Sequence, residues 1–371
     1  MERLATTPTT IRALEWQPLT LSLVEPFGIA GGSHDVARNV LVTVTLADGT
    51  RGYGEAAPLP PYNGETQGSV LAAMPVARAV VEGGDVRAHR AIALALAREI
   101  PDSGAARCAI ETAVLDALTR RASMPLWAFF GGAATSLVTD VTIPTGDVAT
   151  ARASAARWHA RGFTVLKIKV GAASVEEDLA RVLAVRDAAP GARLTLDANA
   201  GLDAERALAL LFGLRDAGVR VDPFEQPVAK GDLAGLLEVG EHVAVAADES
   251  VTSASEALRV FDAAGAVGAG RAEGAPHAIN VKLMKAGIAA ALDVVAVARA
   301  RGLRLMIGGM VESVLAMTTS ACFAAGLGGF DLVDLDTALF IADDAFTGGF
   351  VQRGPHLDLS GIAAGHGVAP R

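Results

Sequence analysis

The chain has 371 residues, of which 51% are hydrophobic and 20% are charged, so it can bury a large core. Its formal net charge of −9 leaves no basic stripe to neutralise phosphates, which excludes nucleic acid as the expected partner. The cysteines, Cys108 and Cys322, lie in apolar stretches and favour buried thiols in a reducing cytoplasm over a disulfide.

The sequence also gives little indication of a secretory signal or a membrane-spanning helix. The first residues lack a charged segment followed by an apolar run, so we expect no secretory signal. Residues 313–330 are uncharged and nearly long enough to span a membrane, but Thr318-Thr319-Ser320 and the glycines after them favour a buried barrel helix with its exit turn. We therefore expect a soluble cytoplasmic protein without a membrane partner.

The first part of the chain, residues 1–138, predicts an α+β domain. Two alternating segments at 39–46 and 51–56 flank Ala47-Asp48-Gly49-Thr50, which is typical of a hairpin. Helical patterns follow at 67–82, 86–99 and 105–121. The Gly/Pro-rich residues 26–33 and 58–64 predict loops.

From about Thr139 onward, short β-branched runs alternate with Ala/Leu-rich helices, which predicts a parallel sheet. A spacing of roughly 25–35 residues suits strand-plus-helix units, and eight such strands close a barrel; a doubly wound open sheet is the alternative. The Gly-rich run at 265–270 has the wrong order for dinucleotide binding and predicts a loop. Residues 339–371 are too irregular for another unit, so we expect them to pack back on the first domain. The predicted strands are 141–144, 165–170, 194–197, 221–225, 243–247, 278–282, 305–308 and 332–335.

Three acids end consecutive predicted strands. The third and fourth strands end at Asp197 and Glu225, and Asp248 comes directly after the fifth. The carboxyl ends of these strands converge on one barrel mouth. Three carboxylates gathered there would repel one another unless a cation lay between them. Ligands without Cys or His select a hard ion, and Mg²⁺ suits this set. A single acid could be a helix cap or a surface charge, but three at equivalent strand ends favour a metal site.

Three lysines are expected at the same mouth. Lys167 and Lys169 alternate on the second strand and therefore point to the same side, the barrel interior. A like-charged neighbour and the metal should lower a lysine pKa, which would leave some neutral amine near pH 7. Lys282, on the sixth strand, lies across the mouth from Lys169. A metal-bound carboxylate between them would present its α-carbon to one amine on each face, which suits 1,1-proton transfer.

These residues resemble the muconate-lactonizing branch of the enolase superfamily, in which lysine and Mg²⁺ chemistry is well known. The motifs occur in order and span nearly the whole chain. They are Lys167-x-Lys169, Asp197-x-Asn199, Glu225-Gln226-Pro227, Asp248-Glu249-Ser250, Asn280-Val281-Lys282-Leu283-Met284-Lys285, Gly308-Gly309-Met310-Val311-Glu312-Ser313 and Gly52-Tyr53-Gly54-Glu55-Ala56-Ala57-Pro58.

The resemblance implies an α/β fold, a modified TIM barrel of the (β/α)7β type at 139–338, capped by an α+β domain at 1–138. It implies Mg²⁺ held by Asp197, Glu225 and Asp248. It also implies that Lys169 and Lys282 form the acid–base pair and that Lys167 polarises the site. The groups around the metal ligands would be Asn199, Glu249 and Glu312.

The eighth strand narrows the reaction. Asp334-Leu335-Asp336 resembles the dipeptide epimerase motif, in which two acids receive the α-ammonium of the substrate. Paired carboxylates would attract a cation and repel succinyl, acyl or muconate carboxyl groups; an Asp pair that caps the following turn is the alternative. Thr142 falls where the family contacts the substrate carboxylate. We expect epimerisation at the C-terminal residue of an L,L-dipeptide, with an N-acylamino acid racemase or o-succinylbenzoate synthase as the second hypothesis and a non-enzymatic metal-binding barrel as the third.

One departure from the family concerns substrate choice. Epimerases that act on Ala-Glu carry an arginine in the first capping loop, where this chain has Gly31. Without that partner an acidic second residue loses its strongest recognition element. Phe27, Ile29 and Tyr62 offer an apolar wall instead, so we expect neutral or hydrophobic dipeptides and a homo-oligomeric enzyme. Gly309 replaces a residue that is often Cys in relatives.

Overall fold

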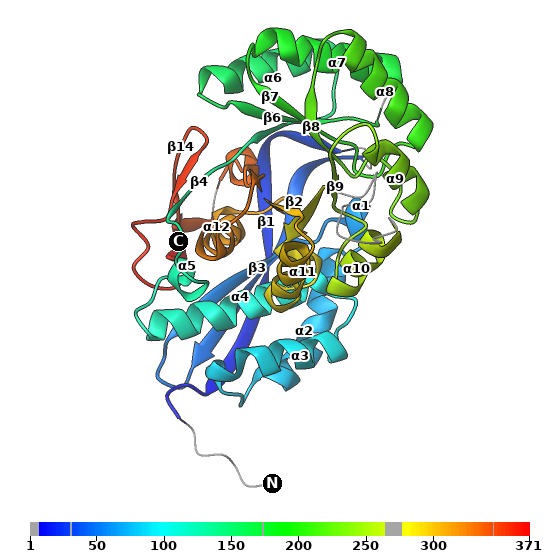
Figure 1. Ribbon diagram of the computed structural model, residues 1–371. Helices are drawn as coiled ribbons and strands as arrows, with labels where there is room; N and C mark the ends of the chain where they lie inside the picture. Colours follow the sequence, from blue (N-terminus) through cyan, green and yellow to red (C-terminus); the bar gives the residue numbers. More distant parts are fainter. Residues whose placement is uncertain (1–6, 30–31, 173, 264–276, 344) are drawn as a thin grey trace.

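The computed structural model describes residues 7–29, 32–172, 174–263, 277–343 and 345–371 (Figure 1). The loop predicted at 265–270 and the specificity residue Gly31 lie outside these ranges. Two sheets organise the described residues: a three-stranded antiparallel sheet near the N-terminus and an eight-stranded parallel sheet. The predicted α/β class, a barrel accompanied by a smaller α+β part, is confirmed.

The N-terminal sheet has the order β1–β2–β3. Its strands are β1 (Ile11–Ile29), β2 (Gly32–Leu46) and β3 (Arg51–Ala56). The predicted hairpin is confirmed, because β2 and β3 pair in antiparallel register and the Leu46 N–H donates to the Thr50 carbonyl across the turn (2.8 Å).

The predicted loop at 26–33 is wrong, because β1 and β2 extend into it as a two-stranded ribbon. Phe27 pairs with His34 in this ribbon, beyond a register shift that begins at Ser22. β1 is an edge strand, and an edge with a register shift tolerates Pro26, which has no N–H to donate.

Helices cover this sheet on one side. They are α2 (Gln67–Val81), α3 (His89–Glu99) and α4 (Gly104–Arg121), with a 3-10 turn, η1 (Val86–Ala88), in the first part of the helix predicted at 86–99. α4 packs along β3 and β2, and Gly54 permits this approach because a Cβ there would collide with the Ala109 carbonyl oxygen. The predicted loop at 58–64 contains a helical turn, α1 (Pro60–Asn63), which begins with proline.

The parallel sheet confirms all eight predicted strands. Its order is β12–β11–β10–β9–β8–β7–β6–β5, the reverse of the sequence. The strands are β5 (Val141–Ile143), β6 (Val165–Lys169), β7 (Arg193–Asp197), β8 (Val221–Glu225), β9 (Val245–Ala247), β10 (Ala278–Lys282), β11 (Arg304–Gly308) and β12 (Leu332–Val333).

A helix separates each neighbouring pair of these strands, which gives the predicted (β/α)7β pattern in the described residues. The helices are α6 (Val148–Ala160), α7 (Val175–Ala188), α8 (Ala204–Asp216), α9 (Leu233–Gly240), α10 (Ala254–Ala263), α11 (Ile288–Ala300) and α12 (Val314–Leu327). The sheet curls until its first and last strands meet: the Asp140 N–H donates to the Val333 carbonyl (2.9 Å). We call this junction of β12 with the start of β5 the seam.

Residues after the barrel contact the later part of residues 1–138. β15 (His356–Asp358) pairs with β4 (Ser136–Val138), β14 (Val351–Arg353) pairs with β15, and β13 (Phe346–Gly348) pairs with β16 (Val368–Pro370). Buried His366 accepts at Nδ1 from the Val368 N–H, and the backbone N–H of His366 donates to Asp116 Oδ1 of α4 (2.9 Å). The short helix α5 (Leu126–Phe129) lies beside this segment, with the Leu126 N–H bonded to the Gly365 carbonyl (2.7 Å).

The apolar stretch at 313–330 forms α12 and its exit turn, as predicted. Ser313 caps the helix and the left-handed Gly328 ends it. None of the helices in the described ranges is both long and apolar enough to cross a membrane. Cys108 and Cys322 are buried free thiols, which confirms the prediction of no disulfide.

Candidate active site

A cavity that is partly open to solvent lies at the carboxyl ends of the parallel strands. Its lining combines strand ends of the barrel with the α1 region of the N-terminal part. Most of the predicted substrate and acid–base residues are in this lining, which consists of Leu59, Pro61, Tyr62, Thr142, Lys169, Asn199, Glu249, Lys282, Gly309, Met310, Val311, Asp334, Asp336 and Thr337.

The strand order puts the two predicted acid–base lysines on opposite sides of this mouth. Lys169 ends β6 and Lys282 ends β10, and these strands are four positions apart in an order of eight. The three strands between them carry the predicted metal ligands, since Asp197 ends β7, Glu225 ends β8 and Asp248 follows β9. We call these three acids the carboxylate arc. The rest of the mouth, from β11 through the seam to β5, lies on the other side.

Each outer lysine contacts one acid of the carboxylate arc. Lys169 Nζ lies 2.6 Å from Asp197 Oδ2, and Lys282 Nζ lies 2.7 Å from Asp248 Oδ2. The Lys282 amine also lies 5.3 Å from the centre of the Tyr62 ring, at cation–π distance. Both amines therefore face the cavity from fixed positions.

Lys167 lies at the centre of the site and is shared among acids. Its Nζ is 3.0 Å from Asp197 Oδ2, 2.7 Å from Glu225 Oε2 and 2.6 Å from Asp334 Oδ2. Its side chain is almost completely buried. Lys167 thus connects the carboxylate arc with the acids that follow β12.

The predicted lowering of a lysine pKa depends on a bound metal ion and stays a prediction; without that ion, the carboxylates around Lys167 and Lys282 act in the opposite direction. Burial disfavours the ammonium form of Lys282, but the Asp248 and Glu225 carboxylates outweigh burial and raise its pKa. Burial likewise opposes the charge of Lys167, and the acids around it raise its pKa well above the usual value. The reason is that both amines lie at ion-pair distance from carboxylates, which favour the charged form.

The carboxylate arc suits a hard divalent cation. Its ligand atoms are all carboxylate oxygens on buried side chains, the ligand type that Mg²⁺ prefers. Burial and the charge of Asp197 raise the pKa of Glu225, as expected when like charges are gathered. Glu225 Oε2 and Asp248 Oδ2 each lie at ion-pair distance from one lysine amine and have no further hydrogen-bond partner, so a lone pair stays available on each. The residues present therefore fit such an ion.

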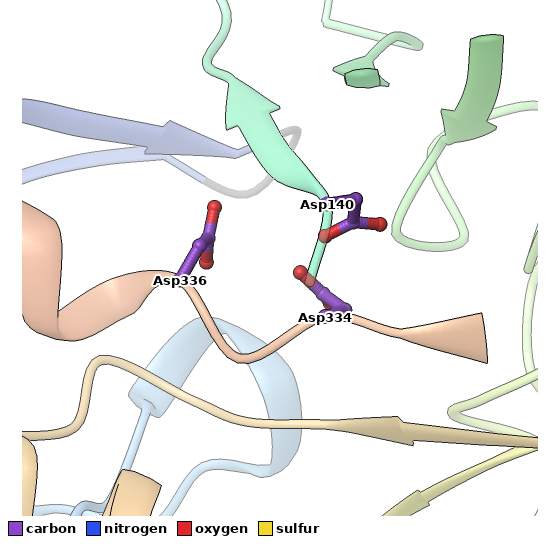
Figure 2. Close-up of side chains that lie close together, drawn as sticks. All are labelled: Asp140, Asp334 and Asp336. Carbon is purple, nitrogen blue, oxygen red and sulfur yellow. The ribbon is translucent and has the colours of Figure 1, made fainter. Parts of the chain in front are cut away.

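A second acidic cluster lies at the seam, and sequence reasoning found only part of it. Asp140, Asp334 and Asp336 each offer an oxygen, and these three atoms lie within 4.8 Å of one another (Figure 2). Among the described residues, it is the only group of three acids whose oxygens lie this close together. We call it the seam cluster. The predicted pair Asp334 and Asp336 is thus brought together, and it faces Thr142, whose N–H donates to Asp336 Oδ2 (2.6 Å).

Lys285 and Arg181 are further site residues without a predicted role. Lys285 Nζ lies 2.7 Å from Asp248 Oδ1 and donates to the backbone carbonyls of Asp248, Val251 and Asn280. Arg181 donates to the Lys169 carbonyl (2.8 Å). Both side chains are buried charges with partners on strand ends. Lys285 follows Lys282 by three residues and Arg181 follows its ion-pair partner Asp178 by three residues, and this spacing is the sequence feature that could have pointed to them.

The three residues predicted to surround the metal ligands have clear contacts: Asn199, Glu249 and Glu312. Asn199 donates its backbone N–H to Asp197 Oδ1 (2.9 Å), and its amide lies 3.4 Å from Glu249 Oε1. Burial and nearby acids raise the pKa of Glu249. Glu312 accepts from the Met310 N–H (2.7 Å), and burial raises its pKa to about 8. Glu312 therefore supports the cavity-lining loop after β11.

That loop is also attached to the N-terminal sheet. Glu55 on β3 accepts from the Ser313 N–H (3.1 Å) and from the Asn39 amide (2.6 Å). Gly309 lies in the same loop, where a Cβ would collide with Met317 Cε and approach Glu312 Oε1 to 3.1 Å. Glycine at this position leaves the space that the buried Met317 side chain fills.

The apolar wall differs in part from the predicted one. Tyr62 lines the cavity as expected, together with Leu59, Pro61, Met310 and Val311. The backbones of Phe27 and Ile29 belong to β1, but their side chains are outside the part of the chain that the structure describes.

Comparison with known proteins agrees with this geometry. Residues 16–131 match the mandelate racemase / muconate lactonizing enzyme N-terminal domain, and residues 150–371 match the enolase C-terminal domain-like family. An aromatic dipeptide epimerase of Herpetosiphon aurantiacus is 49% identical over 363 residues, covering 97% of this chain and 99% of the relative.

Two solved structures are similar over nearly their full length. A mandelate racemase/muconate lactonizing enzyme from Roseiflexus sp. has a TM-score of 0.91 and 56% identity, and 99% of each chain is covered. A dipeptide epimerase from Enterococcus faecalis V583, complexed with Mg and the dipeptide L-Leu-L-Tyr, has a TM-score of 0.90 and 30% identity over 97% of this chain and 99% of that one. The chain belongs to the mandelate racemase/muconate lactonizing enzyme family of the enolase superfamily, on the dipeptide epimerase branch that its motifs predicted, and is an isomerase.

Proposed function

We propose that this enzyme is a Mg²⁺-dependent epimerase of L,L-dipeptides whose C-terminal residue is neutral or hydrophobic. One observation carries the proposal: Lys169 and Lys282 face one cavity from opposite sides, with three acids between them on one arc and Asp334 and Asp336 on the other. The names of the relatives support the substrate class, since the Herpetosiphon protein is an aromatic dipeptide epimerase.

The two lysines exchange the α-proton. In this scheme one of them, as the neutral amine, takes the proton from the α-carbon of the C-terminal residue, and the other, as the ammonium, gives a proton to the opposite face. One C–H bond breaks and one forms, so the substrate changes only its configuration. Lys167 stays charged within the carboxylates and favours negative charge on the substrate.

Asp197, Glu225 and Asp248 would hold the divalent ion. That ion supplies the positive charge that stabilises negative charge developing on the substrate carboxylate. The protein itself orients the ligands: Asn280 donates its amide to Glu225 Oε1 (2.6 Å), and Lys285 fixes Asp248. These contacts keep the arc in place when the substrate enters.

The two ends of the dipeptide have different surroundings. Asp334 and Asp336 would receive the α-ammonium, because two buried carboxylates strongly favour a cation. The wall formed by Leu59, Tyr62 and Met310 would pack against the side chain of the C-terminal residue. An N-acyl or succinyl substrate brings a carboxylate or a neutral amide to the acids instead, and so this chemistry disfavours the alternative racemase and synthase functions.

Proton exchange in D₂O tests the proposal. The purified enzyme with Mg²⁺ is mixed with a library of L,L-dipeptides, and incorporation of deuterium at the C-terminal α-carbon is followed by mass spectrometry. We expect exchange and epimerisation, fastest for hydrophobic C-terminal residues, and loss of epimerisation with Lys282→Ala at unchanged folding. If no dipeptide exchanges, the proposed function fails.

Three further expectations belong to this proposal. We propose the division into a capping domain at 1–138, a catalytic barrel at 139–338 and a C-terminal segment at 339–371 that packs on the cap. The homo-oligomeric state and the cytoplasmic location also stay predictions.

A further inference from the structure

The seam cluster contains one acid that the proposed function does not use. Asp334 and Asp336 line the cavity, whereas Asp140 lies behind them and is not part of the lining. All three residues are buried, with 6% of Asp334, 1% of Asp336 and 6% of Asp140 exposed. Figure 2 shows Asp140 at the start of β5 with its carboxyl group turned toward Asp334.

The hydrogen bonds of the cluster are incomplete. Asp334 Oδ2 accepts from Lys167 (2.6 Å), and Asp336 Oδ2 accepts from the Thr142 N–H (2.6 Å). Asp140 Oδ1 and Asp336 Oδ1 are buried without a hydrogen-bond partner. A buried polar atom left without a partner costs about 1–3 kcal/mol, so a fold that keeps two of them in one cluster points to a cationic group that binds there.

The charges of the cluster are also unbalanced. Among the described residues, Lys167 is the only ammonium at ion-pair distance from the seam cluster. The same amine also forms ion pairs with Asp197 and Glu225. Burial and the charge of Asp334 raise the pKa of Asp140 well above its usual value, and a side-chain hydrogen bond between Asp140 and Asp334 acts in the same direction. Asp334 and Asp336 are the two acids of the cluster that face the cavity.

We propose that Asp140 is a positioning residue, which orients the Asp334 carboxylate from behind so that Asp334 and Asp336 together receive the α-ammonium of the substrate. This inference rests on the proposed function, because it assigns the seam cluster to the N-terminus of a dipeptide. The fold itself sets the contact: the Asp140 N–H closes the barrel on the Val333 carbonyl, one residue before Asp334.

The test compares Asp140→Asn and Asp140→Ala with wild type on two substrates, a hydrophobic dipeptide with a free α-ammonium and its N-acetyl analogue. The measured quantity is kcat/KM for α-proton exchange in D₂O. Asparagine keeps a hydrogen-bond donor for Asp334, so we expect it to retain the wild-type preference for the free ammonium within about threefold. Alanine should lower kcat/KM for the dipeptide by about 10- to 100-fold, mainly through KM, and leave the slow exchange of the N-acetyl analogue unchanged.

Thr139→Val is the matched control. Its hydroxyl accepts from the Leu335 N–H (2.8 Å) at the same seam but is not part of the acidic cluster. We expect this variant to lower stability without changing the ratio of the two substrates. Equal losses for both substrates with Asp140→Ala would overturn the proposal, because they indicate a structural role.

Asp140→Asn keeps the proposal testable if the alanine variant does not fold. A folded asparagine variant that lost the preference for the free ammonium would overturn the positioning role. If wild type exchanges no dipeptide at all, the proposed function fails and this inference fails with it. If wild type exchanges dipeptides but Asp140→Ala loses activity equally on both substrates, only this inference fails.

Discussion

The barrel mouth has two acidic groups of three, and they differ in how their charge is balanced. The carboxylate arc (Asp197, Glu225, Asp248) is contacted by four lysine amines, whereas the seam cluster (Asp140, Asp334, Asp336) is contacted by Lys167 alone among the described residues. The acids of the arc are thus each paired with lysine amines, as the proposed proton transfer beside a metal requires. The seam cluster keeps surplus negative charge, as recognition of an ammonium requires.

The largest effect should follow from a change in the arc. Asp197→Asn removes one charged ligand and the partner of Lys169, and we expect kcat/KM to fall by more than about 100-fold together with weaker Mg²⁺ binding. Titration calorimetry with Mg²⁺ and exchange kinetics measure the two effects. Asp222 lies at the opposite end of β8, is half-exposed and pairs with Arg304, so Asp222→Asn is the matched control and should change neither. Unchanged Mg²⁺ affinity in Asp197→Asn would contradict the assignment of the arc.

A change in the seam cluster should instead alter substrate choice. Asp336→Asn removes a charge that faces the cavity, and we expect a loss of about 2 kcal/mol, or roughly 30-fold in kcat/KM, for dipeptides with a free ammonium. Mg²⁺ affinity should stay at the wild-type value. The carboxylate arc and the seam cluster are functionally distinct only if Asp197→Asn weakens Mg²⁺ binding and Asp336→Asn does not. Weaker Mg²⁺ binding in both variants would contradict the distinction.

The strand ends were predictable, because β-branched runs and the (β/α) rhythm fix which residues end each strand. Lys169, Asp197, Glu225 and Lys282 were therefore found from sequence. Asp140 was missed, since its role depends on pairing across the seam with residues nearly two hundred positions later. β1 was missed because its prolines break the strand pattern, and only its edge position tolerates them.

The loop between the two acidic groups offers a smaller test. Glu55→Ala leaves the Ser313 N–H and the Asn39 amide without their buried acceptor, and we expect a loss of about 3 kcal/mol in the free energy of unfolding. Glu55→Gln keeps one acceptor oxygen and should lose less. Urea denaturation gives both values, and equal stability of all three proteins would contradict the role of Glu55 in attaching the loop after β11.

The smallest effect is expected for Tyr62→Phe. The Tyr62 hydroxyl lies 3.3 Å from Asp248 Oδ1 at the edge of the arc, while its ring stays against Lys282 in the variant. Loss of this hydrogen bond should cost about 1 kcal/mol, or roughly fivefold in kcat/KM. The loss should be equal for free and N-acetylated dipeptides, since the hydroxyl belongs to the arc; a selective loss for one substrate would contradict that placement.

The central claim is that Lys169 and Lys282 act on opposite faces of one α-carbon. Its most direct measurement is α-deuterium exchange of the L,L- and L,D-epimers of one hydrophobic dipeptide with Lys169→Ala and Lys282→Ala. We predict that each variant exchanges the proton of one epimer only, and that the two variants differ in which epimer this is. If both variants exchange the same epimer, the two amines lie on one face and the account is contradicted.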